Sequence, residues 1–249
     1  MRVQWLPEID STNRELVRLA ALGGVEHLTA LATTNQTAGR GRLGRTWTAP
    51  AGTTIAVSVF IAGGPDAPAF ATRMAWLPLA AGLAMTRTVR SLLPGRPVSL
   101  KWPNDVQVDG LKVSGILGEI VPAAGAVLGA GLNLTMSREQ LPVATATSLT
   151  LEGAGPEDLV ERAASAYLSE LESAWRAFEE AGFDPEAGLR ASVSAVCGTI
   201  GRDVRVELPD GSELFGVAEA IDAEGRLVVG DESGRRAVAA GDVTHLRHR

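Results

Sequence analysis

The chain changes character near residue 193, and this change limits the folds that it can adopt. Before that point, short runs of alternating apolar residues are mixed with long amphipathic segments, which is typical of strands combined with helices. After it, glycine-bearing turns separate four short β-forming runs, at residues 204–208, 213–220, 227–229 and 235–239. We therefore predict an α+β domain over residues 1–192 and a small β-barrel over residues 193–249.

Within the first domain, apolar residues spaced three and four apart predict helices. One covers residues 69–93, with Pro78 interrupting it or beginning it, and another covers residues 158–181. A shorter helix is expected from about Arg14 to Leu22. Alternating or continuous apolar runs predict strands at residues 28–34, 53–61, 98–102, 106–108, 113–121 and 126–134.

Composition excludes several classes of protein. Hydrophobic residues make up 45% of the 249 residues, which is enough for a buried core. The formal net charge of −6 argues against whole-chain attraction to nucleic acid or anionic lipid, so an anion site must be a local group of cations. The single cysteine, Cys197, cannot form an internal disulfide, which fits a reducing cytoplasm. The longest uncharged stretch, Thr46 to Pro65, is broken by prolines and glycines, so no transmembrane helix is predicted.

The most distinctive motif is Gly39-Arg40-Gly41-Arg42-Leu43-Gly44-Arg45-Thr46-Trp47. It contains Gly-x-Gly-x-x-Gly, but the residues that follow it include Pro50 and Gly52 and cannot begin the helix that a dinucleotide-binding fold requires. Three arginines without a nearby acid repel one another unless an anion compensates them, and guanidinium groups match carboxylates and phosphates well. By itself the motif fits an anion site, an exposed basic turn or an Arg-Gly segment that touches RNA.

A second motif, Lys101-Trp102-Pro103-Asn104-Asp105, is followed by Lys112-Val113-Ser114-Gly115-Ile116-Leu117. Asp109-Gly110 between them predicts a hairpin with Asp105 and Lys112 on opposite strands. An ordinary hairpin with solvated charges explains this pattern equally well.

Two weaker signals lie at Ser11-Thr12-Asn13 and at Gly131-Leu132-Asn133. Thr12 and Glu15 have the spacing of a capping box, so a helix N-cap is a sufficient explanation of the first. The three histidines, His27, His245 and His248, are scattered, and no metal ligands are predicted.

Taken together and in this order, the motifs resemble the biotin–protein ligase family. The landmarks are Ser11-Thr12-Asn13, Gln36 before Gly39–Trp47, Lys101–Asp105, Lys112–Leu117, Gly131-Leu132-Asn133 and the β-rich tail ending in Gly241-Asp242-Val243-Thr244-His245-Leu246-Arg247. The resemblance covers nearly the whole chain, and it depends on the conjunction of the two longer motifs.

The resemblance implies a mixed-sheet catalytic domain, related to lipoate ligases, followed by a barrel of the Src-homology-3 type. It implies an enzyme that activates biotin with ATP and Mg²⁺ as biotinyl-5′-AMP and transfers biotin to a lysine of a biotin carboxyl carrier domain. No DNA-binding domain precedes these motifs, so a ligase without repressor activity is expected. Monomer and homodimer both remain open.

The resemblance also implies roles for individual residues. Biotin contacts are implied for Ser11, Thr12, Asn13, Gln36, Arg40, Gly41 and Arg42, with the motif glycines Gly39 and Gly115 beside them. Lys112 is expected to contact both biotin and phosphate, and the adenylate contacts are expected at Arg45, Trp47, Asn133 and Arg247. We expect Arg42 and Lys112 to act in catalysis, and we hypothesise that Asp105 orients the acceptor amine or takes its proton.

Two other functions remain as alternatives. A lipoate– or octanoate–protein ligase would use a related catalytic core and similar chemistry. A module that binds nucleic acid through the Arg-Gly segment is disfavoured by the negative net charge and by the lack of aromatic residues within a basic field.

Overall fold

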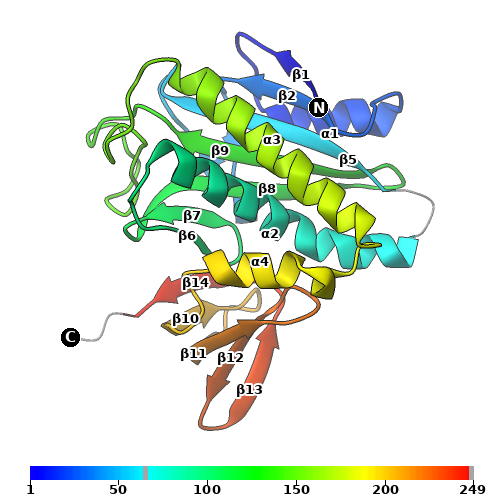
Figure 1. The fold of residues 1–249 in the computed structure, drawn as a ribbon, viewed down its shortest axis with the longest axis vertical. Helices are drawn as coiled ribbons and strands as arrows, with labels where there is room; N and C mark the ends of the chain where they lie inside the picture. Colours follow the sequence, from blue (N-terminus) through cyan, green and yellow to red (C-terminus); the bar gives the residue numbers. More distant parts are fainter. Residues whose placement is uncertain (64–66, 247–249) are drawn as a thin grey trace.

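A seven-stranded sheet forms the centre of the first domain (Figure 1). The structure is a computed structural model that describes residues 1–63 and 67–246. The strands β1 and β2 at one edge run parallel, and the other neighbouring pairs are antiparallel. In order across the sheet, they are β1 (Arg2–Trp5), β2 (Thr29–Thr33), β5 (Thr54–Ala62), β9 (Gly125–Asn133), β8 (Leu111–Val121), β7 (Asp105–Val108) and β6 (Val98–Lys101).

Helices cover both faces of this sheet. The helices α2 (Ala67–Leu92) and α3 (Leu159–Glu180) pack together on one face, and α1 (Thr12–Leu22) packs on the other (Figure 1). The central strands β5 and β9 are therefore buried on both faces, which explains why their sequences are almost continuously apolar. Within the described part of the chain, no helix combines the length and apolar character that crossing a membrane requires.

The C-terminal part forms a second, antiparallel sheet with the order β13-β12-β11-β10-β14. Its strands are β10 (Asp203–Glu207), β11 (Glu213–Ile221), β12 (Leu227–Asp231), β13 (Gly234–Val238) and β14 (Asp242–His245). The α+β class with a mixed catalytic sheet is confirmed, whereas closure of the small sheet into a barrel stays a prediction. The proposed domain boundary at residue 193 also stays a prediction, since α4 (Leu189–Val196) lies across it.

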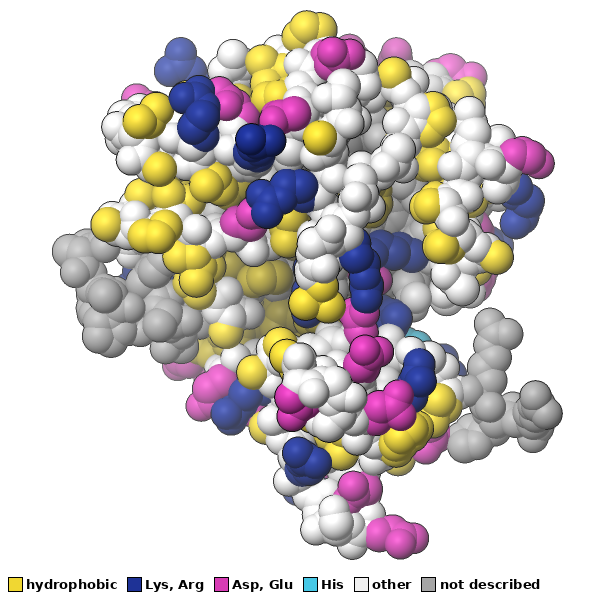
Figure 2. All heavy atoms as spheres, turned by 180° about the vertical axis from the view of Figure 1, so that it is seen from behind, with side chains coloured by type: hydrophobic (Ala, Val, Ile, Leu, Met, Phe, Trp, Pro, Cys, Tyr) yellow, Lys and Arg dark blue, Asp and Glu magenta, His cyan; other side chains and the backbone are white. Residues whose placement is uncertain are grey.

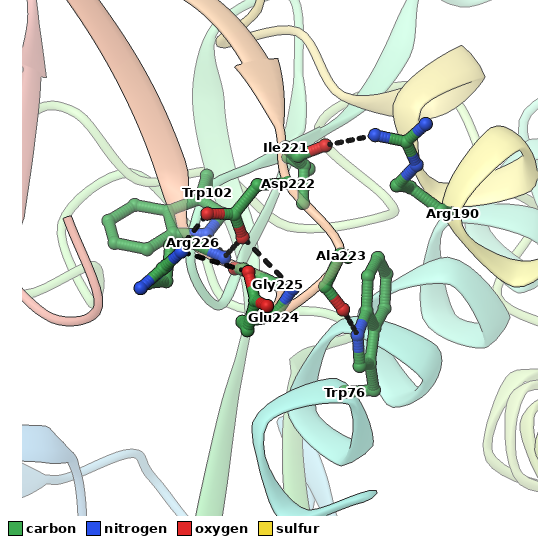
Figure 3. A network of polar contacts seen from close by, with 9 residues as sticks. All are labelled: Trp76, Trp102, Arg190, Ile221, Asp222, Ala223, Glu224, Gly225 and Arg226. Atoms are coloured by element: carbon green, nitrogen blue, oxygen red, sulfur yellow. Dashed lines mark hydrogen bonds and ion pairs between the residues drawn. The ribbon is translucent and has the colours of Figure 1, made fainter. Parts of the chain in front are cut away.

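The turn between β11 and β12 attaches the small sheet to the first domain (Figure 3). The indole of Trp76 in α2 donates a hydrogen bond to the Ala223 carbonyl at 2.8 Å, and that of Trp102 donates to the Gly225 carbonyl at 3.1 Å. Asp222 shapes the turn by accepting from the backbone N–H and the side chain of Arg226. Because both tryptophans are buried, these contacts fix the small sheet close to the Lys101–Asp105 motif.

Candidate active site

A pocket lies where the start of α1, the segment 36–47 and the strands β5, β8 and β9 meet. Ten residues predicted for the site line it, namely Ser11, Thr12, Asn13, Gln36, Arg40, Gly41, Arg42, Trp47, Lys112 and Gly115. Eight lining residues were not predicted, namely Ala56, Ser58, Asn104, Ile116, Leu117, Gly129, Ala130 and Gly131. Segments far apart in the sequence therefore converge on one hollow.

The first turn of α1 supplies polar groups to this pocket. The N-cap is Ser11, whose hydroxyl accepts from the Arg14 backbone N–H at 3.4 Å. The capping box predicted at Thr12 is thus wrong, because Thr12 is the first helical residue. Its hydroxyl lies 2.7 Å from Ser58 Oγ and 3.2 Å from Gln36 Oε1. With the capping role taken by Ser11, Thr12 and Asn13 are available for the pocket.

Buried polar side chains form the floor of the pocket. Ser58 on β5 lies 2.5 Å from Asn13 Oδ1, and the Asn13 amide donates to Glu119 Oε2 on β8 at 2.9 Å. Ser58 and Asn13 are almost fully buried, so these hydrogen bonds replace those with water. Ser58 and Glu119 were missed from the sequence, although a serine within the apolar run of β5 is a signal for such a role.

The Gly-Arg segment folds over the pocket as a small two-stranded ribbon of β3 (Gly39–Arg40) and β4 (Thr46–Trp47). The expectation that no long helix follows the glycines is correct, because only a 3₁₀ turn at Arg42–Gly44 and β4 come next. Within the turn, Leu43 has a φ of 55° and Gly44 a φ of 74°, the left-handed region in which glycine is unstrained.

Each arginine of this segment is held by a different acceptor. Arg40 forms an ion pair with Glu119 at 3.0 Å, and Arg42 donates to Asn104 Oδ1 at 2.8 Å. Arg45 forms an ion pair with Asp242 on β14, so the small sheet holds one end of the segment. Burial lowers the pKa of the Arg42 guanidinium, while Asp242 and Asp105 act in the opposite direction. Arg45 does not line the pocket, and Asp242 was not among the predicted site residues.

Close approach explains two glycines of the motifs. A Cβ at Gly39 would lie 2.5 Å from the Trp47 carbonyl oxygen, and a Cβ at Gly131 would lie 2.8 Å from the Trp47 ring. Both positions must therefore remain without a side chain for Trp47 to reach the pocket wall. The Trp47 indole N–H is buried and has no acceptor among the described residues, so it is free to donate to a ligand.

The predicted hairpin is present and brings a cation and a carboxylate together. Strands β7 and β8 are joined at Asp109-Gly110, and Lys112 Nζ lies 2.6 Å from Asp105 Oδ1. The contact is one of opposite charges, and Oδ1 has no aligned hydrogen-bond donor in the described structure. Lys101, at the end of β6, adds another cation, and burial lowers its pKa while Asp105 raises it.

Figure 2 shows how the charged side chains are distributed on the face opposite to that in Figure 1. Lys and Arg side chains gather where the first domain meets the small sheet, with acidic side chains below them. Lys112 and Arg42 line the pocket, and Asp105 contacts Lys112 without lining the pocket itself. Cations near a partly enclosed hollow attract an anionic ligand more strongly than the same charges would in open solvent.

Asn133 positions a neighbouring segment and does not line the pocket. Its amide donates to the Thr147 carbonyl at 2.8 Å, and Lys112 exchanges backbone hydrogen bonds with Thr145 and Thr147. Asn133 thus supports the segment that holds the backbone of Lys112. Arg247, the remaining predicted residue, lies outside the described residues.

His245 on β14 should make the stability of the protein depend on pH. It lies 3.1 Å from the Thr199 hydroxyl, and burial lowers its pKa to about 4, with smaller contributions from Lys101 and Arg202. An unfolded histidine takes up a proton near pH 6.5, whereas the folded protein resists protonation down to about pH 4. Acidification between these values therefore favours the unfolded state.

We expect His245→Gln to reduce the loss of unfolding free energy between pH 7 and pH 4, as measured by urea denaturation at several pH values. The Thr199 contact is retained by a glutamine, so stability at pH 7 should change little. An equal pH dependence in both proteins would show that His245 is not the responsible group.

The comparisons with known proteins agree with this geometry. Residues 5–133 match the biotin/lipoate A/B protein ligase family, and residues 199–246 match the biotin protein ligase C-terminal domain. The sequence is 42% identical to the biotin–[acetyl-CoA-carboxylase] ligase of Mycobacterium tuberculosis over 95% of this chain and 86% of that protein. It is 34% identical to the bifunctional ligase/repressor BirA of Escherichia coli over 90% of this chain and 68% of that protein.

A solved structure shows the same arrangement of both sheets. The biotin protein ligase from Aquifex aeolicus, in complex with biotin and ATP, superimposes with a TM-score of 0.78. The match has 25% sequence identity and covers 99% of each chain.

The two-sheet fold and these matches place the chain in the class of protein ligases. Within this class, the chain belongs to the biotin/lipoate A/B protein ligase family. The resemblance inferred from the motifs is thereby confirmed.

Proposed function

We propose that the protein is a biotin–protein ligase that activates biotin with MgATP and transfers it to a lysine of a biotin carboxyl carrier domain. The observation that carries this proposal is the pairing of a hydrogen-bonding floor with a cationic rim in one pocket. Thr12, Asn13 and Ser58 form the floor, and Arg42 and Lys112 belong to the rim. Biotin has the same two parts, a polar ureido ring and a carboxylate at the end of an aliphatic chain.

The polar floor favours biotin over lipoate. The dithiolane ring of lipoate has no N–H or carbonyl group and would leave the buried hydroxyls and amides without new partners. A site built to hydrogen-bond its substrate rejects an analogue that lacks the matching groups strongly. Lipoate or octanoate ligation is therefore the second candidate.

In the first step, a carboxylate oxygen of biotin attacks the α-phosphorus of ATP, and the bond to the pyrophosphate leaving group breaks. The step brings two anions together, so its barrier is largely electrostatic. We assign Lys112 and Arg42 to stabilise the negative charge on the reacting groups, and Arg40 to hold the segment over them. The described residues contain no group of three or more side chains able to hold a metal, so Mg²⁺ would be bound mainly through the phosphates of ATP.

The nucleotide would lie beside Trp47, at the end of the pocket formed by β8 and β9. The unpaired Trp47 indole N–H supports this placement because it offers a donor at the pocket wall. Arg45, Asn133 and Arg247 are proposed to contribute to this side. Arg45 would act from outside the pocket, where Asp242 holds it.

In the second step, the acceptor lysine amine attacks the acyl carbon of biotinyl-5′-AMP, an amide forms and AMP leaves. A lysine amine has a reference pKa of ~10.4 and must lose a proton before it attacks. Asp105 is proposed to orient this amine or accept its proton, since its carboxylate lies at the site in contact with Lys112. We place the reaction in the cytoplasm, where its acceptor carboxylase would also be.

The proposal is tested by supplying the purified protein with MgATP and biotin, lipoate or octanoate and measuring pyrophosphate release. Of the three acids, only biotin should support rapid release of pyrophosphate. The release should reach one equivalent per enzyme molecule, because the acyl-adenylate stays bound to the enzyme. Release with lipoate or octanoate but not with biotin would favour the second candidate. No release with any of the acids would contradict both.

Gly129 should be essential for the polar floor. A Cβ at this position of β9 would overlap with Asn13 Oδ1 and displace the amide from Ser58. We expect Gly129→Ala to weaken biotin binding about tenfold, the usual value of one hydrogen bond. Isothermal titration calorimetry measures this change.

Gly118→Ala on the adjacent strand is the matched control. The nearest atom to a Cβ there is Pro78 Cγ at 3.2 Å, and Gly118 does not line the pocket. The affinity of the Gly118→Ala variant for biotin should stay within about twofold of that of the unsubstituted protein, as is usual for small changes away from a site. Equal effects of both substitutions would contradict the role given to the floor.

A further inference from the structure

We propose that Glu119 is a positioning residue that sets the direction of the hydrogen bonds across the pocket floor, so that the floor accepts hydrogen bonds from ligand N–H groups. Glu119 lies on β8 and does not itself line the pocket. The inference rests on the proposed function and specifies how the site would recognise the two N–H groups of a ureido ring.

Glu119 fixes the orientation of the Asn13 side-chain amide. Asn13 Nδ2 lies 2.9 Å from Glu119 Oε2 and 3.3 Å from the Leu117 carbonyl oxygen. A carboxylate and a carbonyl only accept hydrogen bonds, so the NH₂ group must face them and Oδ1 must face Ser58. The ion pair between Arg40 and Glu119 holds the carboxylate in place.

This orientation determines where the hydroxyl hydrogens point. Asn13 Oδ1 only accepts, so Ser58, 2.5 Å away, must donate its hydrogen to it. The Thr12 hydroxyl donates to Gln36 Oε1 at 3.2 Å, and its oxygen lies 2.7 Å from Ser58 Oγ. Both hydroxyl hydrogens are therefore used within the protein, and oxygen lone pairs remain for a ligand.

Glu119 provides the shorter of the two contacts that hold this direction, and the Leu117 carbonyl provides the longer one. A glutamine at this position could donate as well as accept, and the Asn13 amide could then turn over. Asn13 would donate to Ser58, and the Ser58 hydrogen would turn to Thr12 or into the pocket. A floor that donates would oppose the N–H groups of the ligand, so Glu119→Gln should affect recognition of those groups more than overall binding.

The test compares biotin with two analogues, each methylated at one ureido nitrogen, by isothermal titration calorimetry. In the unsubstituted protein, biotin should bind much more tightly than at least one analogue. We compare the ratio of the affinity for biotin to the affinity for that analogue. In Glu119→Gln this ratio should fall about tenfold, since the advantage of one N–H hydrogen bond is lost. The rate constant for pyrophosphate release at saturating biotin should stay within about threefold, because Glu119 does not contact the reacting groups.

An exchange variant, Asn13→Asp with Glu119→Gln, provides the rescue. The aspartate accepts on both sides, from the glutamine amide and from Ser58, so the original direction returns with the total charge unchanged. Its ratio should recover to within about threefold of the unsubstituted protein.

The outcomes separate this inference from the proposed function. Biotin binding with an unchanged ratio in Glu119→Gln overturns the role of Glu119 alone, as does a ratio that the exchange variant fails to restore. A variant whose affinity falls equally for all three ligands, or that loses its native circular dichroism, would show a merely structural role. An unsubstituted protein that does not bind biotin would overturn the proposed function and this inference together.

Discussion

Lys112→Met is expected to lower the rate of biotin-dependent pyrophosphate release by about 10²–10³-fold, the usual cost of losing one preorganised charge or donor at a reacting oxygen. Lys112 lines the pocket that also contains Arg42, and its ammonium is the cation in contact with Asp105. Methionine retains most of the aliphatic side chain, so the packing against Gly115 is largely preserved. The pre-steady-state burst of pyrophosphate measures the effect directly.

Removal of Lys112 also leaves Asp105 as an uncompensated carboxylate next to two anionic substrates. A double variant, Lys112→Met with Asp105→Asn, separates this repulsion from the loss of the cation. We expect the double variant to recover only part of the rate, because the cation itself is still missing. A Lys112→Met protein that releases pyrophosphate within about tenfold of the normal rate would contradict the electrostatic role.

Asp105→Asn is expected to slow the transfer of biotin from preformed biotinyl-5′-AMP to the acceptor by roughly 10²-fold, the lower end of the range for a general acid or base. Asparagine keeps the size of the side chain but cannot take a proton from the acceptor amine. Formation of biotinyl-5′-AMP should be affected less, since this step does not involve the amine. Single-turnover assays with the isolated adenylate separate the two steps.

Asp109→Asn is the matched control for this prediction. Asp109 lies at the tip of the same hairpin, where it forms an ion pair with Arg96 at 2.6 Å, away from the pocket. Its transfer rate should be close to normal. The role of Asp105 would be wrong if Asp105→Asn slowed adenylate formation but left transfer from the preformed adenylate intact.

Much of the fold could be predicted because its signals are local. The periodic helices and the apolar strands lie where the sequence placed them, within a few residues at each end. β1 was missed because it is an edge strand of only four residues, three of which are exposed. The helix α2 runs through Pro78, which the sequence left as an interruption or a start. Burial of Trp76, Leu77 and Leu79 around it outweighs the cost of about 3 kcal/mol for a proline inside a helix.

The site was predicted to the extent that its residues lie in recognisable motifs. Ser58, Glu119 and Asp242 were missed because their partners are distant in the sequence. Glu119 contacts Asn13 across 106 positions, and Asp242 contacts Arg45 across 197. Local spacing carries no information about such pairs. The motifs therefore identified the cations that line the pocket, whereas the residues that hold the arginines and the polar floor in place required the structure.

The central claim is that these cations and the polar floor make the chain join biotin to a protein lysine. Incubation with biotin, MgATP and a purified biotin carboxyl carrier domain tests it most directly, with the intact mass of the acceptor as the readout. We predict that the acceptor gains one biotinyl group, and only when biotin, MgATP and the protein are all present. An acceptor that keeps its mass here, but is biotinylated by the Escherichia coli ligase in a parallel reaction, would contradict the account.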